Sequence, residues 1–369
     1  MGHLVLIGGG HAHAGVLFDT AKIIAQGHQV TLINPTPQHY YSGMGPGVLG
    51  GTYSPEQIRF PVKAMVEARG GTFVEDRMVS VDAASRTVLL ASGGTVDYDV
   101  LSFNAGSVIP TPDETPPQSK DVLTVKPIQN LWFGRERIET LLKQGPVRVA
   151  VVGGGPAALE VAGNARSVRV DGRSPEVTVF AGKKFLRNLP ERIRSMALAN
   201  FARRGINVLE AGYVHRAESG RVILQSGDEH KADVIFLALG VRPPTLFADS
   251  GLTTGPDGGL AVNRFLQSAQ HPEIFGGGDC IHFTDQPLDK VGVYAVRQHP
   301  VLVHNLSAQL NGQPLMPFDP GGKYLLIFNL GDGTGIFMKW GLIFGGKPAF
   351  WFKDTIDRRF MALFSTDNG

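Results

Sequence analysis

Short apolar runs alternate with helical patterns along this chain, as in proteins built from buried parallel strands and covering helices. The first apolar run, residues 4–7, is followed by a helical pattern over residues 12–25 and a second apolar run over residues 29–33. We expect strand, helix and strand here, which is the unit of an α/β fold. The same order recurs at residues 147–152, 156–165 and 176–180.

Three glycines end the first strand of each copy. The two stretches read Leu4-Val-Leu-Ile-Gly-Gly-Gly10 and Val147-Arg-Val-Ala-Val-Val-Gly-Gly-Gly155. In a dinucleotide-binding unit, the first glycine permits the tight turn and the second lets a pyrophosphate approach the backbone at the helix N-terminus. One such motif is weak, but two in this setting predict two dinucleotide sites. A glycine turn without a nucleotide stays the alternative for each copy.

The third small position of the motif differs between the copies. The second copy fits there with Ala158, whereas the first copy fits at Gly8 and Gly10 but has His13. We expect this histidine to point away from the strand, or the helix to stand slightly off it.

The acidic residue that usually binds a ribose hydroxyl is missing from both copies. The first copy has Asn34, whose amide oxygen can still accept a hydrogen bond. The second copy has Ala181, followed by Lys183 and Lys184. Because no carboxylate repels a 2′-phosphate there, these lysines favour NADPH over NADH.

Composition limits the class of protein. The chain has 369 residues, enough for two or three domains, and its 43% apolar and 18% charged residues suit a globular fold. A net charge of +2 gives no electrostatic case for nucleic acid as partner. No apolar run approaches the ~20 residues of a membrane span, and the N-terminus does not resemble a signal peptide. We expect a cytoplasmic protein.

Cys280 is the single cysteine, which excludes an intramolecular disulfide, a Cys-x-x-Cys redox pair and a thiolate metal cage. We expect it to be a small buried residue rather than a redox-active thiol. His11 and His13 are two positions apart at the start of a helix, which points them in different directions. We therefore expect no metal site.

Three further stretches carry a resemblance to a known family. Residues 98–107 look like the strand that closes the first FAD segment, residues 233–243 like its counterpart in an NAD domain, and residues 271–280 like the late FAD motif. The chain thus resembles the two-dinucleotide-binding-domain flavoproteins of the pyridine nucleotide-disulfide oxidoreductase superfamily. Within it, residues 8–13, 41–48 and 292–298 are most similar to type II NADH dehydrogenase-like proteins and to the flavoprotein domain fused to selenophosphate synthetases.

This resemblance implies an α/β protein with two Rossmann-like domains, in which an NAD(P) domain interrupts the FAD domain, plus a small C-terminal α+β segment. It implies FAD as cofactor and NADH or NADPH as co-substrate. The expected segments are residues 1–112 and 244–310 for FAD, 113–243 for NAD(P) and 311–369 for a hairpin and an amphipathic helix.

The resemblance also implies site residues. It places the ribitol chain of FAD on Asp279, the adenine on the backbone of Met78, and the N-terminus of a helix at Gly292 on the flavin edge where negative charge collects. The implied FAD contacts are Gly8, Gly9, Gly10, His11, Asn34, Met78, Ala105, Gly106, Asp279 and Gly292. The implied contacts of the pyridine nucleotide are Gly153, Gly155, Ala158 and Lys183.

Two charged residues are candidate catalytic groups. By the resemblance, Glu160 can reach the nicotinamide or the flavin edge, and Lys290 can add positive potential ahead of the helix at Gly292. An exposed helix glutamate and a solvated surface lysine are the alternatives. Tyr41 belongs to a loop that would run beside the flavin ring, or it simply packs.

Departures from the family pattern narrow the subclass. A single cysteine does not suit disulfide reductases or sulfide:quinone reductases. Val293 stands where type II NADH dehydrogenases often have a glutamine, which puts a quinone acceptor in doubt.

The C-terminal segment is rich in aromatic residues. Residues 324–344 predict a hairpin around residues 331–334, and residues 349–364 predict an amphipathic helix. Such a helix suits the inner face of a membrane as a peripheral contact, or it covers the domain or forms a homodimer. The apolar face expected for it comprises Phe352, Ile356, Phe360 and Leu363.

The leading hypothesis is an FAD-dependent NAD(P)H:acceptor oxidoreductase that delivers electrons to a quinone or a small carrier. The alternative is a flavin-binding accessory or regulatory protein with a vestigial nicotinamide site. A reductase for ferredoxin or rubredoxin is the third hypothesis, and it would depend on one small acidic partner.

Overall fold

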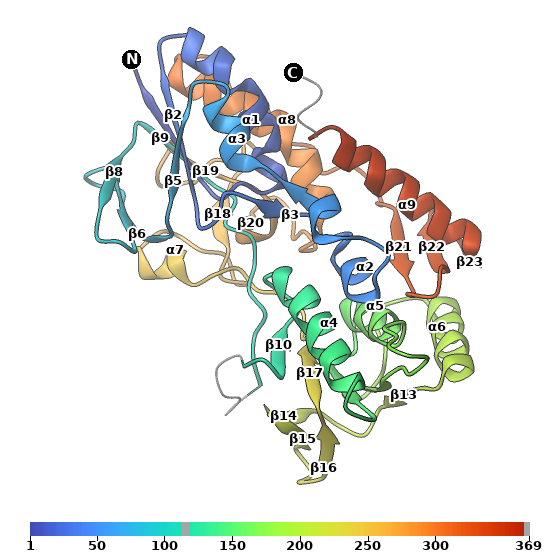
Figure 1. The fold of residues 1–369 in the computed structure, drawn as a ribbon. Coiled ribbons are helices and arrows are strands. Elements are labelled where there is room, and N and C mark those ends of the chain that lie inside the picture. Colours follow the sequence, from blue (N-terminus) through green and yellow to red (C-terminus); the bar gives the residue numbers. More distant parts are fainter. Residues whose placement is uncertain (113–118, 365–369) are drawn as a thin grey trace. The chain divides into compact units, whose positions relative to one another are not determined.

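The computed structural model describes residues 1–112 and 119–364, and its ribbon is drawn in Figure 1. Parts of two expected segments, residues 113–118 and 365–369, lie outside this description. The described chain forms an α/β fold with parallel sheets, as the sequence predicts. It divides into unit 1, with residues 1–39, 60–108 and 241–322, and unit 2, with residues 40–59, 109–240 and 323–369.

Unit 1 is built on a parallel sheet of five strands in the order β19-β9-β1-β2-β5. Its central strand β1 pairs with β2 from His3↔Gln29 to Ile7↔Ile33, and with β9 from Leu4↔Val100 to Ile7↔Phe103. The apolar runs of the sequence are therefore the buried middle of this sheet. The strands are β1 (His3–Ile7), β2 (Gln29–Asn34), β5 (Thr72–Glu75), β9 (Val100–Phe103) and β19 (Ile274–Gly276).

Two helices of unit 1 lie side by side over this sheet (Figure 1). They are α1 (His11–Ala25) and α8 (Gly292–Leu310). The close approach of the two helices requires a glycine at position 15, because a Cβ there would come within 2.1 Å of the His299 ring. The other elements of this unit are α3 (Val62–Glu67), β6 (Met78–Asp82), β7 (Thr87–Leu90), β8 (Thr95–Asp97), α7 (Leu246–Asp249), β18 (Leu260–Val262), η2 (Gly278–Cys280) and β20 (Ile281–Phe283).

Unit 2 repeats the plan with a parallel sheet in the order β10-β17-β11-β12-β13. The strands are β10 (Val122–Thr124), β11 (Arg148–Val152), β12 (Glu176–Phe180), β13 (Ile206–Leu209) and β17 (Val234–Leu237). Its helices α4 (Gln129–Leu142), α5 (Pro156–Ala165) and α6 (Glu191–Arg204) accompany an antiparallel sheet of β14 (Val214–Glu218), β15 (Gly220–Leu224) and β16 (Glu229–Ala232).

Residues 40–59 of unit 2 form short elements. Met44, Val48, Tyr53 and Ile58 make a small buried cluster there. The elements are α2 (Gly45–Gly50) and η1 (Pro55–Ile58), and the two-stranded sheet of β3 (His39–Tyr40) and β4 (Arg59–Phe60) flanks the segment.

The C-terminal part of unit 2 corrects the expected hairpin. The chain forms an antiparallel sheet of three strands rather than two, followed by a helix that begins two residues earlier than expected. The elements are β21 (Leu326–Asn329), β22 (Gly335–Lys339), β23 (Leu342–Gly346) and α9 (Lys347–Ala362).

The buried face of α9 is also not the expected one. Lys353 and Asp357 are only 8% and 4% exposed, whereas Trp351 and Leu363 are 61% and 62% exposed. Burial of these charges is compensated because the Lys353 Nζ lies 2.7 Å from both the Asp357 Oδ2 and the carbonyl oxygen of Gly43. Phe352, Ile356 and Leu363 of the predicted apolar face are exposed as well, so most of that face does not pack on the unit, and contact with a membrane or a second copy stays a prediction.

None of the helices among the described residues has both the length and the apolar character needed to cross a bilayer.

Candidate functional site

The first glycine turn joins β1 to α1 by close backbone contact. Gly8 has a φ of +87°, and a Cβ there would lie 2.3 Å from the carbonyl oxygen of Asn104. The Gly8 N–H donates to the Ile33 carbonyl at 2.9 Å, so the turn is held by both neighbouring strands. A larger residue at Gly8 is excluded by space and by backbone conformation.

Asn34 holds the same turn through its side chain. Its Oδ1 accepts the Gly9 N–H at 3.0 Å, and its Nδ2 donates to the Thr36 carbonyl at 2.6 Å. The Asn34 amide therefore occupies the position where a carboxylate is usual, and its hydrogen bonds hold the glycine loop in place. Its oxygen retains a second lone pair for a ribose hydroxyl.

His13 points toward the strands, so the first of the two expected arrangements, a ring that points away, does not occur. The ring is fully buried, with Nδ1 2.7 Å from the Gly8 carbonyl and Nε2 2.8 Å from the Ser102 hydroxyl. Burial lowers the pKa of His13 to about 4, so the ring is neutral. Because a carbonyl only accepts, Nδ1 carries the hydrogen and Nε2 accepts from Ser102. These two hydrogen bonds allow a polar ring to be buried in the first turn of α1.

The N-terminus of α1 is suited to an anion. Gly10 is its N-cap, no side-chain cap is formed among the described residues, and the first turn carries no acidic residue. The first N–H groups of such a helix favour phosphate. His11 is packed instead of extended into solvent, since its ring lies 5.6 Å from His39 and 5.5 Å from Phe60.

The second glycine turn has the same backbone design. Gly153 has a φ of +144°, and a Cβ there would lie 2.2 Å from the carbonyl oxygen of Ala238. The Gly153 N–H donates to the Phe180 carbonyl at 3.0 Å. Gly155 is the N-cap of α5, and Ala158 is fully buried in its first turn.

The residue at the position of the missing acid differs between the two turns, with Asn34 in the first and Ala181 in the second. Ala181 is buried, and its carbonyl lies where a Cβ on Gly154 would clash at 2.5 Å. Lys183 is exposed two positions later. The second turn thus offers backbone N–H groups and an exposed lysine where the first offers an amide.

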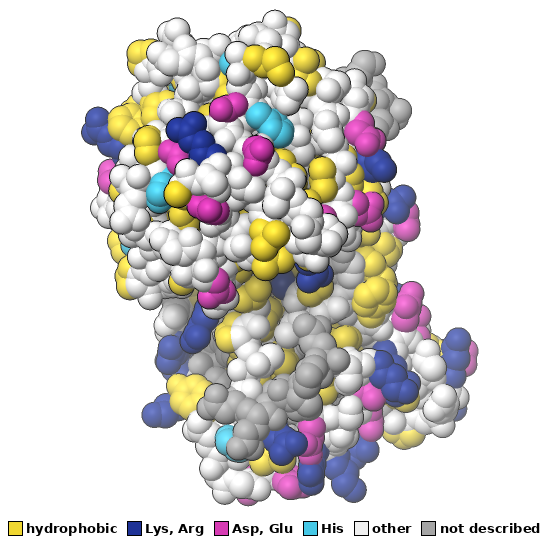
Figure 2. Space-filling view, turned by 90° about the vertical axis from the view of Figure 1, so that its left-hand side faces the viewer, with side chains coloured by type: hydrophobic (Ala, Val, Ile, Leu, Met, Phe, Trp, Pro, Cys, Tyr) yellow, Lys and Arg dark blue, Asp and Glu magenta, His cyan; other side chains and the backbone are white. Residues whose placement is uncertain are grey.

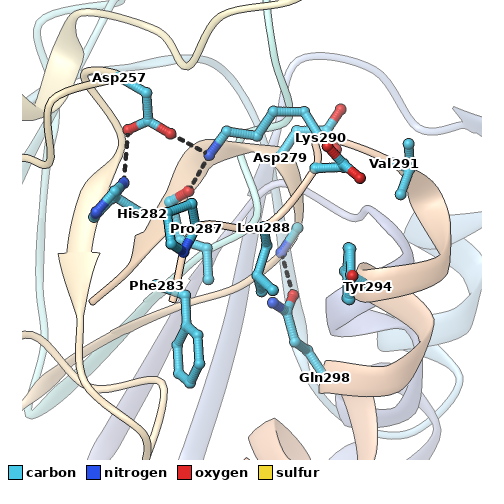
Figure 3. A pocket seen from close by; sticks show the side chains of 13 residues that line it. Asp257, Asp279, His282, Phe283, Pro287, Leu288, Lys290, Val291, Tyr294 and Gln298 are labelled. Atoms are coloured by element: carbon cyan, nitrogen blue, oxygen red, sulfur yellow. Dashed lines mark hydrogen bonds and ion pairs between the residues drawn. The ribbon is translucent and has the colours of Figure 1, made fainter. Parts of the chain in front are cut away.

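Asp279 lines a pocket in unit 1 (Figure 3). It sits in η2, and the Ser107 hydroxyl donates to its Oδ2 at 2.8 Å. Ala105 and Gly106 precede this serine in the loop that follows β9. Gln298 of α8 lines the same pocket and accepts the Gly278 N–H at 2.7 Å.

Lys290 lines the pocket as a paired charge. Its Nζ lies 2.7 Å from the Asp257 Oδ2 and donates to the Ile281 carbonyl, as the dashed lines of Figure 3 show. Burial would raise the pKa of Asp257, but hydrogen bonds from Lys290 and Gly259 and the lysine charge hold it below its usual value. Lys290 is therefore a partly buried lysine whose charge is paired with the Asp257 carboxylate. Two residues on, Gly292 begins α8, whose N-terminus has no side-chain cap among the described residues.

Other predicted residues take structural positions. Met78 begins β6 in unit 1 and is partly buried. Cys280 is fully buried with its Sγ 3.3 Å from the Gly277 carbonyl, and burial raises the pKa of this thiol to about 12. Such a thiol is unreactive at neutral pH.

Glu160 belongs to a buried cluster of charges in unit 2. Its Oε1 accepts the Asn329 N–H at 2.7 Å. Burial raises the pKa of Glu160 to about 7, although the Lys353 charge opposes this. Burial would lower the pKa of Lys353, but the carboxylates of Asp357 and Glu160 outweigh it and raise that pKa.

Tyr41 completes this cluster. Its hydroxyl donates to the Asp357 Oδ1 at 3.0 Å, and burial together with this carboxylate raises its pKa well above the usual value. Sequence reasoning missed Lys353 and Asp357, which it assigned to the polar face of an amphipathic helix. Their i, i+4 spacing was the available signal, since it places opposite charges beside one another on a helix.

Charge on the surface is mixed. On the face drawn in Figure 2, acidic and basic side chains are interspersed among uncharged ones. This agrees with the small net charge of +2 and gives no extended basic footprint on that face for nucleic acid.

The residues of unit 1 fit a bound FAD. The uncapped start of α1, the glycine cradle at Gly8 and the carboxylate of Asp279 supply an anion site and a hydroxyl acceptor in one unit.

Comparison with known proteins identifies the family of the chain. The family model described as pyridine nucleotide-disulphide oxidoreductase matches residues 2–309. Among curated proteins, the chain is 25% identical to ferroptosis suppressor protein 1 of Taeniopygia guttata, over 72% of this chain and 71% of that protein. It is 23% identical to type II NADH:quinone oxidoreductase of Staphylococcus aureus, over 96% of this chain and 94% of that protein.

Among solved structures, the fold is similar to NDH2 from Plasmodium falciparum in complex with NADH. The TM-score is 0.81 at 15% identity, over 98% of this chain and 96% of that chain. At this identity the likeness concerns the fold.

Proposed function

The chain belongs to the pyridine nucleotide-disulphide oxidoreductase family, and from this premise we propose that it is an NAD(P)H dehydrogenase that delivers electrons to a quinone or another small carrier. It is an FAD-dependent, NADH dehydrogenase-like oxidoreductase with NAD(P)H as co-substrate. When bound, the flavin accepts a hydride and passes electrons on singly or in pairs. The choice between NADH and NADPH and the identity of the acceptor belong to the proposal.

One observation carries the proposal: the same backbone turn occurs twice. Gly8 and Gly153 each have positive φ, and each leaves no room for a Cβ against the residue that follows the neighbouring strand. Each turn leads into a helix whose N-cap is a glycine. A flavin nucleotide on the first and a pyridine nucleotide on the second give one donor and one acceptor of hydride.

The electrons leave the flavin without a protein disulfide. The chain has one cysteine, Cys280, whose buried thiol has a pKa of about 12. An intramolecular dithiol relay is therefore not available, and the acceptor must take electrons from the flavin directly.

Glu160 is suited to handle a proton in this reaction. Its pKa of about 7 allows both protonation states near neutral pH, as an acid–base group requires. Quinone reduction consumes protons, and the relatives include a type II NADH:quinone oxidoreductase. This supports a quinone even though Val293 stands where a glutamine is frequent in that class. In this proposal Lys353 and Asp357 hold the charge balance around Glu160.

The exposed apolar side of α9 suits a membrane surface. Trp351, Phe352, Ile356 and Leu363 are exposed on this helix, and Trp340 and Leu342 are exposed on the neighbouring sheet. Aromatic and aliphatic residues on one side of a helix bind at the boundary of headgroups and acyl chains. Such contact would bring the protein to a lipid-soluble quinone.

Vesicle flotation tests this contact. The holoprotein should float with vesicles of phosphatidylethanolamine and phosphatidylglycerol, and replacing Trp351 and Ile356 by Ser should reduce the bound fraction severalfold. Replacing the exposed Lys347 by Ser on the same helix is the matched control. A wild-type protein that stays unbound would overturn membrane contact, and a concentration-dependent dimer lost in the double variant would assign the face to homodimerisation.

Steady turnover tests the enzymatic proposal. With a soluble quinone or ferricyanide as acceptor, the purified protein should oxidise NADH or NADPH continuously, read at 340 nm. Glu160→Gln should lower kcat with the quinone more than kcat with ferricyanide, because only the quinone needs protons.

A flavin-binding accessory protein is the second candidate function. The observation in its favour is Ala181, a buried alanine at the position where a carboxylate usually binds the ribose. This candidate predicts bound FAD but no turnover with either nucleotide and either acceptor.

A further inference from the structure

Asn104 stands out because the two units differ at its position. It follows β9 directly, just as Ala238 follows β17, and both residues donate their N–H to the preceding central strand at 2.8 Å. The carbonyl oxygens of both residues also lie close to the first glycine of their turn. A Cβ added to that glycine would lie 2.3 Å from the carbonyl oxygen in unit 1 and 2.2 Å from it in unit 2. The backbone role is therefore the same, and only the side chain of Asn104 is additional.

That side chain lies between two glycine loops of unit 1. A Cβ on Gly10, the N-cap of α1, would come within 2.8 Å of the Asn104 Nδ2. A Cβ on Gly278, next to Asp279, would come within 2.8 Å of the Asn104 Oδ1. The two glycines thus clear the space that the carboxamide occupies, at the start of the helix that favours phosphate.

The amide nitrogen of Asn104 is a donor without an acceptor. The residue is 8% exposed, and its Nδ2 has no hydrogen-bond partner within the part of the chain that the structure describes. Buried amide groups are rarely left in that state, so this donor needs an acceptor from outside the chain, either a ligand or a water molecule. Asn34 offers a contrast, since both ends of its amide are engaged with the loop.

We propose that Asn104 is a ligand of the FAD diphosphate, with its Nδ2 donating to a phosphate oxygen. The inference rests on the assignment of FAD to unit 1 made above. A phosphate oxygen is an acceptor only, and the Nδ2 of an amide is a donor only, so the two are matched. The contact adds a side-chain ligand to the backbone N–H groups of α1. Unit 2 has no counterpart, because an alanine side chain cannot donate.

Reconstitution of the apoprotein with FAD and with ADP tests this contact. Asn104→Ala removes the donor and should raise the Kd of FAD by about tenfold, the effect of losing one charge-assisted hydrogen bond. Asn104→Asp places a carboxylate beside the phosphates and should raise it by about a hundredfold or more. ADP lacks the ribityl chain, so its Kd should rise by the same factors. A ribityl hydroxyl as partner would leave ADP binding unchanged and tolerate the Asp variant, which would overturn the proposal.

Thermal unfolding separates a ligand from a structural residue. Because the Nδ2 has no protein partner, Asn104→Ala should change the melting temperature of the apoprotein little while lowering that of the FAD-loaded protein. In Asn305→Ala, a buried amide that donates to Phe265 and Met316 is removed, and both melting temperatures should fall together. An equal fall for the Asn104 variants would contradict the proposal.

The Asp279→Ala variant distinguishes the two possible failures. If Asp279→Ala loses FAD and the Asn104 variants keep it, the phosphate contact is wrong and the FAD site stands. If all three keep FAD with wild-type affinity, the site itself is wrongly assigned.

Discussion

The two glycine turns share a backbone but differ in how the rest of the protein holds them. In unit 1, the Asn34 amide accepts from Gly9 and the His13 ring bonds the Gly8 carbonyl. In unit 2, the corresponding turn is held through backbone groups, with the Leu186 N–H donating to Gly154 at 2.7 Å. A loop that is already held in place loses less conformational entropy when a ligand binds. The first turn is therefore suited to a resident cofactor and the second to a nucleotide that exchanges.

The units differ in charge as well. The polar groups at the first turn are neutral, since His13 has a pKa of about 4 and Asn34 does not titrate. Unit 2 buries Glu160, Lys353 and Asp357, whose charges depend on one another. Binding in unit 1 should thus be insensitive to pH near neutrality, whereas events in unit 2 should follow the titration of Glu160.

Asp279→Ala should produce the largest change, loss of FAD and a colourless protein. The variant removes the acceptor that Ser107 orients at 2.8 Å, and a charge-assisted hydrogen bond of this kind is worth about 1.5–3 kcal/mol. The ratio of flavin absorbance to protein absorbance measures it. Asp285→Ala, at an exposed carboxylate of the next loop, is the control. A fully retained yellow cofactor would speak against the assignment.

Lys353→Met should destabilise unit 2 by about 3–5 kcal/mol, because it leaves the buried Asp357 without its cationic partner and with only the Tyr41 hydroxyl to offset its charge. Urea unfolding followed by tryptophan fluorescence measures the free energy of unfolding. The exposed Lys347→Met on the same helix should have little effect. Adding Asp357→Asn to the Lys353→Met variant should restore part of the loss, and no recovery would argue against the pair.

Glu160→Gln should remove a pH dependence of stability. The folded protein holds the pKa of Glu160 at about 7, above its ordinary 4.5, so it binds the proton more tightly than the unfolded chain does. Stability from this group is full below about pH 4.5 and is lost as the pH rises to about 7. Between pH 5 and 8, wild type should lose up to about 3 kcal/mol relative to the variant. Parallel stability curves would show that Glu160 titrates normally.

Lys183→Ala should have the smallest effect, a rise of about two- to fivefold in KM for NADPH with NADH unchanged, as for an exposed charge pair. Lys231→Ala, another exposed lysine of unit 2, controls for net charge. Equal changes with both nucleotides would remove Lys183 from the recognition of a 2′-phosphate.

The sequence predicts the parts of this structure that depend on short-range patterns. The apolar runs and the glycines place β1, β11, α5 and β12 within a residue, because a buried strand and a turn with positive φ restrict the residue types allowed. The fold class, the cofactor and the family are confirmed. Contacts at long range were not predictable. His13 bonds Ser102, 89 residues away, and a lone sequence does not show that a histidine at this position of the motif has such a partner.

The face of α9 shows the same limit. Periodicity identifies two faces of a helix but not which one is buried when the charged face has partners elsewhere. Lys353 finds Asp357 four residues away and Gly43 more than three hundred residues away. The Gly43 contact, like the bond from Tyr41 to Asp357, depends on the fold and is not visible in the helical periodicity. The roles proposed for Asp279, Glu160 and Lys290 stay predictions.

An anaerobic titration of the purified protein's visible flavin spectrum with NADH and, separately, with NADPH shows whether both turns work as proposed. We expect bleaching near one equivalent by at least one nucleotide, because the first turn holds FAD and the second binds the hydride donor. A flavin that stays oxidised with both nucleotides, yet bleaches with dithionite, would contradict a working second turn and favour the accessory protein.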